Sequence, residues 1–342
     1  MANRSGLLWF VGLLSLSSCI SFEKYPIEVY KPSSYFFPKN VHTVGIVSRN
    51  LKYTNDTLQN YLAENGRLVK EKKPFDTDYI AKKVCLDSLA KKLDSKNSFD
   101  SVFVIPVESF REIKVKDIRP AVPEWYKSIA DKSGADALIL LDMFSCFYSI
   151  DDRSDNPQVN IITSNIWSVY DARATKIVDR FRQIDTLYWN GYDDEGNYKK
   201  FKLPDKKEAI RLAAGVIAQS YAKHIISDWT MVYREIILNS NRELATAAKL
   251  AKKGEWEKAK AIWQKCQAGH IKKNRIISLY NLSLASEMDG DIDKALELTA
   301  KAASESSGVF LANLNQATKE YSAILYKRKI ELQKLKQQNE IQ

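Results

Sequence analysis

Positions 135–143 read ADALILLDM, and this stretch decides the fold class. The continuous apolar run LILL at positions 138–141 shows no alternation with polar residues, so it predicts a strand that is buried on both faces. Gly134 precedes the stretch and closes a predicted helix at 123–132, since glycine accepts the positive φ common at helix ends. The stretch therefore predicts the central strand of a sheet with helices on its faces.

The sequence around this strand supplies further strands and helices. Apolar and β-branched runs predict strands, and leucines at helical spacing predict a helix between the first two of them. The predicted elements are strands at 41–47 and 99–105, a helix at 77–93, and two long strands at 158–170 and 176–189. This order predicts a mixed sheet flanked by helices. The fold class of residues 41–200 is therefore α+β, a mixed α/β sheet domain.

Beyond residue 200 the chain is predicted to be almost wholly helical. Residues 201–240 form a predicted helical connector, because their apolar residues recur at helical spacing. Residues 241–342 form an all-α domain with a repeat, in which KGEWEKA at 253–259 recurs as DGDIDKA 36 residues later. In each copy a glycine occupies the predicted tight turn between two helices, and an alanine stands where those helices approach closely. A helix at about 310–337 is the predicted C-terminal cap.

This period and composition resemble tetratricopeptide repeats, whose usual period is about 34 residues. The second copy is the better match, through the sequence LYNL at 279–282. The resemblance implies a groove that holds a peptide or protein segment, because stacked helical repeats present extended concave surfaces. The candidate partner-binding residues are Trp256, Trp263, Tyr280 and Asn281, although aromatic residues at this spacing more often belong to a core.

The first eighteen residues differ in composition from the rest. Arg4 precedes a short apolar run at 7–14, which is typical of a signal peptide and shorter than the ~20 residues of a membrane-spanning helix. Residues 16–19 read LSSC and resemble the lipobox of bacterial lipoproteins. The resemblance implies cleavage after residue 18 and acylation of Cys19, with residues 19–40 as a lipidated tether. The alternatives are an ordinary secretory signal with a chance cysteine, or a buried apolar strand.

The α/β region also resembles known envelope lipoproteins. The path from VGIV at 44–47 through SVFVI at 101–105 to SGADAL at 133–138 is similar to the small domain of CsgG-like and LpoB-like proteins, which assemble or bind a partner. The whole layout resembles a family of uncharacterised bacterial envelope lipoproteins with C-terminal tetratricopeptide repeats. This resemblance brings no known activity. It implies a membrane-anchored protein of the bacterial cell envelope, at the outer membrane and facing the periplasm or the surface.

Charge and cysteine content restrict the partners. The chain carries 52 Lys and Arg against 42 Asp and Glu, a formal net charge of +10. Lysine pairs along the predicted helices indicate solvated faces, and an exported protein rarely meets nucleic acid, so we expect no nucleic-acid partner. Cys85, Cys146 and Cys266 lie in apolar contexts without metal-site spacing, which predicts small buried side chains. A disulfide between Cys85 and Cys146 is left open.

No catalytic motif accompanies these features. His42, His224 and His270 lack the spacing of a metal pair or a nearby nucleophile. The chain has no nucleophile elbow, zinc-protease helix or phosphate-binding glycine loop. The acidic turns at 151–155 and 289–293 lack the glycine and glutamate of a calcium loop and are interpreted as solvated turns. We therefore expect no metal, no cofactor and no enzymatic activity.

Three functions from different classes remain. The favoured one is a non-enzymatic, lipid-anchored envelope protein that acts as a scaffold for a protein or peptide partner, through its repeats and its α/β domain. The alternative is a structural subunit that self-assembles in an envelope complex. The third is an envelope glycan-active enzyme with dispersed carboxylates, for which the sequence offers no positive feature. The oligomeric state is left open by the sequence.

Overall fold

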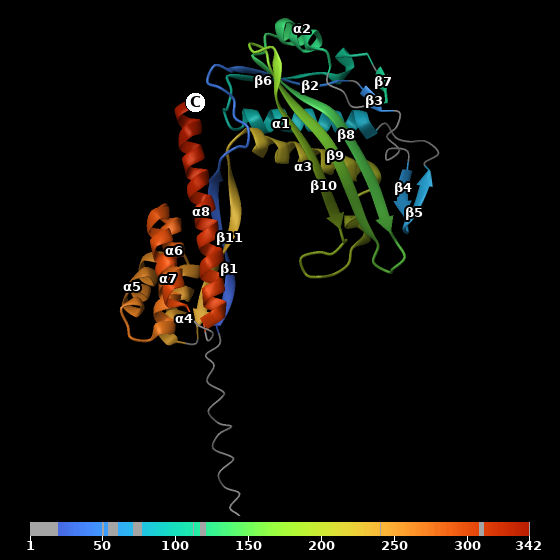
Figure 1. Ribbon diagram of the computed structural model, residues 1–342. Coiled ribbons are helices and arrows are strands. Elements are labelled where there is room, and N and C mark those ends of the chain that lie inside the picture. The colour runs from blue at the N-terminus through green and yellow to red at the C-terminus, as the bar shows by residue number, and fades with distance from the viewer. Residues whose placement is uncertain are drawn as a thin grey trace, which may run out of the picture. The chain divides into compact units, whose positions relative to one another are not determined.

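The computed structural model describes residues 20–49, 51–53, 61–70, 77–111, 113–116, 121–239, 241–307 and 311–341 (Figure 1). The signal peptide expected at 1–18 and the lipidation expected at Cys19 lie outside these residues. The chain forms two compact units. The helical unit comprises the described residues up to Pro32 together with those of Asp228–Glu340, and the α/β unit is built on Ser33–Ser227. No helix in the described ranges has both the length and the apolar content needed to span a membrane.

The α/β unit is built around a seven-stranded mixed sheet. Its strands are β2 (Thr43–Ser48), β4 (Tyr61–Glu64), β5 (Arg67–Lys70), β6 (Ser101–Ile105), β8 (Ala137–Asp151), β9 (Gln158–Asp171) and β10 (Lys176–Trp189). Five of them lie in the order β10-β9-β8-β2-β6, while β4 pairs with β8 and with β5. β2 is parallel to β6 and β8, whereas β8, β9 and β10 run antiparallel to one another in turn. A separate parallel pair joins β3 (Leu51–Tyr53) to β7 (Ile113–Val115).

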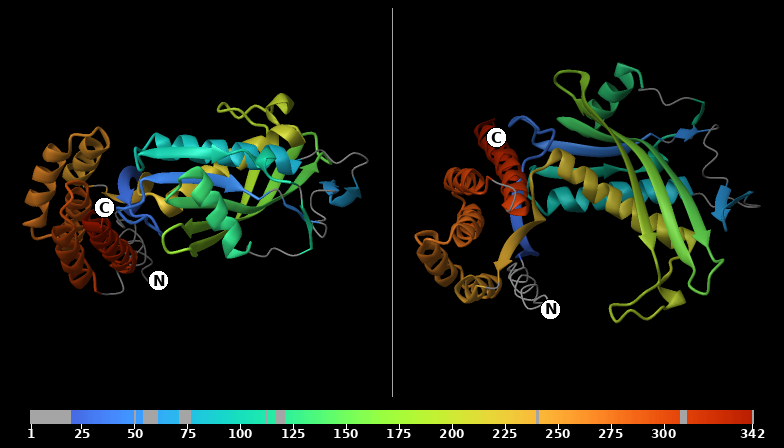
Figure 2. Two further views of the ribbon diagram at one scale, coloured as in Figure 1. Left: turned by 90° about the horizontal axis from the view of Figure 1, so that it is seen from above. Right: turned by 60° about the horizontal axis from the view of Figure 1, so that its bottom comes forward.

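Helices cover both faces of this sheet. The helices α1 (Thr77–Asp94) and α3 (Lys206–Ile225) pack together on one face, and α2 (Pro123–Ser133) covers part of the other (Figure 2). Among the described residues, the unit also has two short 3-10 turns, η2 (Val107–Ser109) and η3 (Lys200–Lys202). The larger core lies under α1 and α3, where the Trp167 and Tyr221 rings stack at a centroid distance of 4.4 Å.

The run at 138–141 lies in β8 and is buried on both faces, as predicted. Ile139 and Leu141 belong to the core that α1 and α3 cover, whereas Leu138 and Leu140 belong to the core beneath α2. The strand continues to Asp151, beyond its predicted end, because its outer half still pairs with β9. A mixed-sheet region followed by a helical region is confirmed as the fold class.

Gly134 and Asp136 join α2 to the start of the sheet. Gly134 follows the helix with a φ of 69°, a conformation that glycine adopts without steric cost. The Asp136 Oδ2 accepts hydrogen bonds from the backbone N–H groups of His42 and Thr43, each at 2.9 Å. Burial raises the pKa of Asp136, but these two donors, together with the nearby charge of Arg173, outweigh burial and hold its pKa below the ordinary value. The charged carboxylate thus fixes the first residues of β2 beside those of β8.

The helical unit contains a two-stranded antiparallel ribbon of β1 (Ile20–Lys31) and β11 (Asp228–Asn239), paired along their whole length. Residues 20–31 are therefore a strand and not part of a free tether at 19–40. The helical connector expected at 201–240 also differs from the structure, because α3 ends at Ile225 and β11 follows.

The ribbon forms because both segments alternate along their length. Trp229, Met231 and Tyr233 are each more than half exposed, whereas Arg234 and Ile236 are buried on the opposite face. A period of two is the pattern of a half-buried strand and cannot place one apolar stripe on a helix. The partner strand is distant in sequence, so the pairing itself has no local signal.

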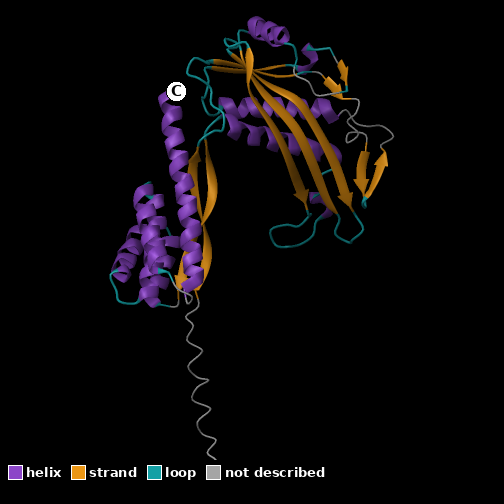
Figure 3. Ribbon diagram, in the orientation of Figure 1, coloured by secondary structure: helices purple, strands orange, loops and turns teal. Residues whose placement is uncertain are grey.

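Five helices complete the helical unit (Figure 3). They are α4 (Arg242–Lys252), α5 (Trp256–Gln267), α6 (Lys272–Met288), α7 (Ile292–Glu305) and α8 (Ala312–Ile341). Gly254 and Gly290 lie between paired helices with φ values of 82° and 83°, in the turns that the sequence repeat predicts. Ala259 and Ala295 are fully buried where the helices approach. Residues of β11 share the core of these helices.

Candidate functional site

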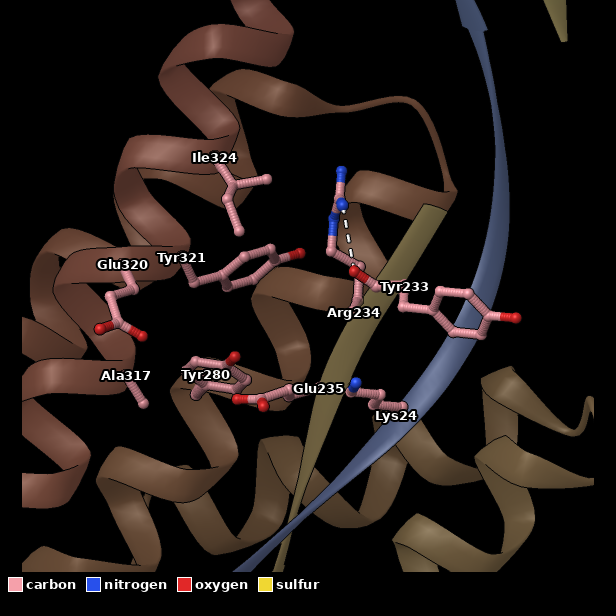
Figure 4. Close-up of a pocket in the computed structure, with 9 residues that line it drawn as sticks. All are labelled: Lys24, Tyr233, Arg234, Glu235, Tyr280, Ala317, Glu320, Tyr321 and Ile324. Atoms are coloured by element: carbon pink, nitrogen blue, oxygen red, sulfur yellow. Dashed lines mark hydrogen bonds between the residues drawn. The ribbon is translucent and has the colours of Figure 1, made fainter. Parts of the chain in front are cut away.

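The helical unit contains an open pocket of ≈ 210 Å³ between the ribbon, α6 and α8 (Figure 4). The residues that line it are Lys24, Tyr233, Arg234, Glu235, Tyr280, Ala317, Glu320, Tyr321 and Ile324. Charged, aromatic and aliphatic side chains therefore meet at one surface. This mixture is typical of sites that bind and orient another molecule.

One of the lining residues, Arg234, belongs to a buried ion pair. The side chains of Arg234 on β11 and Glu287 on α6 are 8% and 2% exposed. The Arg234 Nε lies 2.9 Å from the Glu287 Oε2, and its Nη2 lies 2.7 Å from the Oε1, so the contact is bidentate. The Tyr321 hydroxyl on α8 donates to the Glu287 Oε2 at 2.7 Å. Buried charges are tolerated when they are paired and hydrogen-bonded in this way, and the network ties three elements together.

Tyr280 on α6 lies beside Tyr321 in the wall of the pocket. Their rings pack at a centroid distance of 5.1 Å with 42° between the planes. Tyr280 is only 3% exposed, yet its hydroxyl has no hydrogen-bond partner among the residues that the structure describes. The side chain lines the open pocket, so its hydroxyl can be reached from solvent. The hydroxyl is therefore a polar group that a ligand could satisfy.

Two carboxylates lie close to this hydroxyl. Glu235 and Glu320 are exposed side chains, and Figure 4 shows them on either side of Tyr280. Burial raises the pKa of Tyr280, and the carboxylates of Glu235, Glu287 and Glu320 raise it further, while Arg234 opposes them. Three carboxylates and one guanidinium therefore act on the hydroxyl, in addition to its burial.

The remaining lining residues form the rim. Lys24 on β1 stands opposite Glu235 in the strand register. Ile324 on α8 is 40% exposed and gives one side an aliphatic surface. The rim thus adds one cation and one apolar contact to the two exposed carboxylates and the aromatic wall.

Only one of the four candidate partner-binding residues lines this pocket. Tyr280 does so, whereas Trp263 is fully buried in the helical core. Trp256 is half-buried, and its ring contacts Tyr25 at 5.3 Å and Trp263 at 6.2 Å between centroids. These tryptophans therefore fill the core around α5 and do not meet Tyr280 in a shared pocket.

Asn281, the fourth candidate, bonds to the ribbon. It is fully buried, its Nδ2 donates to the Ile237 carbonyl at 2.9 Å, and its Oδ1 accepts the Ile237 N–H at 3.0 Å. The side chain satisfies both backbone groups of one β11 residue, as a neighbouring strand would. Asn281 thus attaches α6 to the ribbon.

Sequence reasoning did not identify Arg234, Glu287 or Tyr321 as site residues. A charged residue in a strand or helix is normally exposed, so composition alone does not indicate that Arg234 and Glu287 are buried. The only local signal is the position of Arg234, which falls on the buried face once the alternation of β11 is recognised. Tyr321 lies on the apolar side of α8, where a core position is the ordinary expectation.

The other titratable groups have structural contacts. Cys85, Cys146 and Cys266 are buried thiols, and Cys85 and Cys146 form no disulfide. Burial raises the pKa of the Cys85 thiol, which keeps it protonated. His224 lies 2.9 Å from Asp179 and stacks on a neighbouring aromatic ring. In the described ranges no three His, Cys, Asp or Glu side chains gather as a metal site would require.

The two acidic turns are also engaged by neighbouring groups. Arg153 pairs with Asp151 and holds its pKa at about 2. In the second turn, the Asp291 Oδ1 accepts the Lys294 N–H at 2.9 Å and caps α7. Asp289 pairs with Lys260 at 2.9 Å. These contacts agree with the interpretation of both segments as solvated turns.

Several solved structures are similar to part of this chain, with TM-scores well below 0.5. The PelC dodecamer from Paraburkholderia phytofirmans has 10% identity and a TM-score of 0.26, over 60% of this chain and 100% of that chain. Protein XCC0632 from Xanthomonas campestris has 11% identity and a TM-score of 0.27, over 57% and 91%. A neuraminyllactose-binding hemagglutinin homologue from Helicobacter pylori has 14% identity and a TM-score of 0.23, over 58% and 86%.

Two family models match the sequence itself. The model described as Domain of unknown function (DUF6340) matches residues 245–331, within the helical unit. The model described as Domain of unknown function (DUF8603) matches residues 41–236, which span most of the α/β unit and most of β11. A search of curated proteins found no significant match. Because the second of these models covers more than half of the chain, the protein belongs to the DUF8603 family.

Proposed function

We propose that the protein is a non-enzymatic, lipid-anchored component of the bacterial cell envelope whose helical unit binds a protein or peptide partner. The pocket beside Tyr280 carries this proposal. The Tyr280 hydroxyl lacks a partner in the described part of the chain, and the wall that holds it is fixed by the Arg234–Glu287 ion pair. A polar group that is already fixed in the free protein favours association, because little conformational entropy is lost when the partner binds.

The helix pairs α4–α5 and α6–α7 support a binding role. They resemble tetratricopeptide repeats in sequence, and their turns have nearly equal φ values of 82° and 83° at Gly254 and Gly290. Stacked units of this kind commonly bind an extended segment. The resemblance of the α/β unit to CsgG-like and LpoB-like domains supports a second contact with an envelope component.

A pull-down from solubilised envelopes tests the partner. Ile324→Arg places charge and bulk at the pocket wall, whereas Tyr326→Arg makes a similar change on the same helix outside the pocket, at a side chain that is 61% exposed. We expect Ile324→Arg to lose a protein that the wild type and Tyr326→Arg retain. Identical partner lists for all three proteins would contradict the proposed function.

Membrane attachment through Cys19 is proposed from the LSSC sequence at 16–19. Since β1 starts at Ile20, an acyl group on Cys19 would hold the ribbon at the outer-membrane surface without an intervening tether. Mass spectrometry of the N-terminal peptide from purified membranes tests this attachment. We expect a peptide that starts at a diacylglyceryl-modified Cys19. An unmodified Cys19, or a peptide that retains residues 1–18, would contradict it.

Self-assembly is the second candidate function, and the edge of the sheet favours it. No strand of the described chain pairs with the outer edge of β10, where Ile184 and Tyr188 are 59% and 51% exposed. Long open edges are templates for pairing with another chain. Sedimentation of the detergent-solubilised protein should then show an oligomer that Ile184→Lys weakens. A monomer at all concentrations would exclude this candidate.

A further inference from the structure

We infer that the pocket beside Tyr280 takes the ammonium or guanidinium group of a lysine or arginine side chain that the partner presents. This inference rests on the proposed function and names the chemistry that the bound segment must carry. It is argued from three features of the pocket: its charges, its aromatic and aliphatic walls, and the unpaired hydroxyl.

The charges at the pocket favour a cation. Arg234 is compensated by Glu287 at 2.7 Å. Among the described lining residues, this leaves the carboxylates of Glu235 and Glu320 against the ammonium group of Lys24. Both carboxylates are exposed, so an arriving cation can reach them without disturbing the buried pair. A cation that pairs with a carboxylate forms charge-assisted hydrogen bonds, which are stronger than neutral ones, and the excess of carboxylate charge disfavours an anion.

The uncharged groups fit the rest of a basic side chain. The Tyr280 hydroxyl can accept a hydrogen bond from an ammonium or guanidinium N–H. The packed rings of Tyr280 and Tyr321 offer an aromatic surface that attracts a cation. Ile324 and Ala317 give an aliphatic surface for methylene groups. Lysine and arginine are the side chains that combine a cationic head with such a stem.

The same lining disfavours a bare metal ion. Metal sites in proteins gather several acidic, histidine or cysteine ligands around one point. Within the described residues, including this pocket, no group of three or more such side chains lies close enough to hold a metal. The lining offers hydrogen-bond acceptors and ring faces, which suit an organic cation.

Peptides with one variable residue test the inference. Full-length protein purified in detergent is titrated with fluorescein-labelled Gly-Ala-Leu-X-Leu-Ala-Gly, where X is lysine, arginine, glutamine or norleucine, and binding is followed by fluorescence anisotropy. We expect the lysine and arginine peptides to bind about tenfold more tightly than the other two, the ratio that loss of one charge-assisted hydrogen bond produces. Equal binding of the four peptides overturns the inference.

Single substitutions and a matched control test whether the preference for basic peptides arises in the pocket. We expect Glu235→Gln, Glu320→Gln and Tyr280→Phe each to reduce the preference for lysine by about three- to tenfold. These changes are mild, since Glu320→Gln keeps an oxygen for its contact with Gln316 and Tyr280→Phe keeps the ring. Glu28→Gln removes the same charge from an exposed position on β1 outside the pocket and should leave the preference unchanged. Unchanged selectivity in the two acidic variants also overturns the inference.

A competition experiment distinguishes a peptide side chain from a free amine as the source of the cation. Cadaverine carries free ammonium groups without a peptide, so it should displace the lysine peptide only at far higher concentration than unlabelled peptide does. Displacement by cadaverine at equal concentration would assign the pocket to free amines and overturn the inference. If peptide selectivity fails while Ile324→Arg still removes a partner in the pull-down, the proposed function stands and only the chemistry named here is wrong.

Discussion

Arg234, Glu287 and Asn281 are polar side chains that lie buried where the ribbon meets α6. Each is satisfied by a specific partner, so a shift of β11 along the helix would leave a charge or an amide unpaired. Apolar contacts alone would tolerate such a shift more easily. The polar contacts therefore fix where Arg234 and Glu235 enter the pocket.

The buried ion pair gives a stability prediction. Glu287→Gln leaves the Arg234 guanidinium without its counter-charge and should lower the free energy of unfolding by about 3–5 kcal/mol. The double variant Arg234→Met/Glu287→Leu removes both charges and should cost less, because neither buried charge remains unpaired. Urea denaturation of the two variants measures the difference. A double variant less stable than Glu287→Gln would contradict this account of the pair.

Asp136 gives a pH-dependent prediction. Its pKa is lowered in the folded protein, so its stabilising effect is fully present above the ordinary pKa of about 4 and is lost as the pH falls through the folded pKa. Asp136→Asn should lower stability by about 1–2 kcal/mol at pH 7, through loss of charge-assisted bonds to His42 and Thr43. Denaturation at pH 7 and pH 3 should show that the difference from wild type shrinks at low pH. A constant difference would contradict this role.

Some helices and strands have a signal in their own sequence, whereas the strand pair β1 and β11 has none. The apolar run at 138–141 and the two glycine turns are visible in sequence, and the structure has β8, α4–α5 and α6–α7 there. The sequence predicts helix through β11 because the helical spacing of the apolar residues in α3 is extended past Ile225, where that helix ends. Its partner β1 directly follows Cys19, the expected lipid anchor, and the segment after such an anchor is usually an extended tether. Pairing between two segments that are distant in the sequence decides both elements.

Hydrogen exchange tests the ribbon directly. Backbone amides of Ile20–Lys31 that bond across to β11 should exchange much more slowly than those of an unstructured chain. Peptides from 20–31 and 228–239 should also show similar protection, since each strand is paired with the other. Exchange of residues 20–31 within seconds would restore the tether interpretation.

The two glycine turns give a second prediction at this scale. Gly254→Ala and Gly290→Ala should each cost about 1–2 kcal/mol, because φ values of 82° and 83° are unfavourable for alanine. A Cβ at either position would meet nothing within 4 Å, so steric contact does not contribute. Gly215→Ala in α3 is the control, since its Cβ would make only an ordinary 3.8 Å contact, and it should not destabilise. Thermal denaturation that ranks the three variants alike would contradict this explanation.

The candidate site was predictable only in part, for a physical reason. The repeat indicated Tyr280 and its neighbour Asn281 on one helix, but successive helical residues point in different directions. Tyr280 consequently lines the pocket, whereas Asn281 faces β11. Arg234 and Tyr321 come from two other elements, and only the folded helical unit brings them to Glu287.

At the scale of the whole molecule, the helical unit includes both the strand that follows Cys19 and the pocket beside Tyr280. The α/β unit is built on the continuous segment between β1 and β11. In the proposed function, the unit that carries the pocket is also the unit next to the membrane anchor. The partner would therefore be held close to the membrane surface.

Photo-crosslinking in living cells tests partner binding most directly, because it reports what touches the pocket wall in the envelope. A benzophenone amino acid is placed at position 324, and at position 326 as the control on the same helix outside the pocket. The account predicts a discrete adduct with one envelope protein from position 324, lost in the Glu320→Lys background, and none from position 326. No adduct from either position, or the same adducts from both, would contradict it.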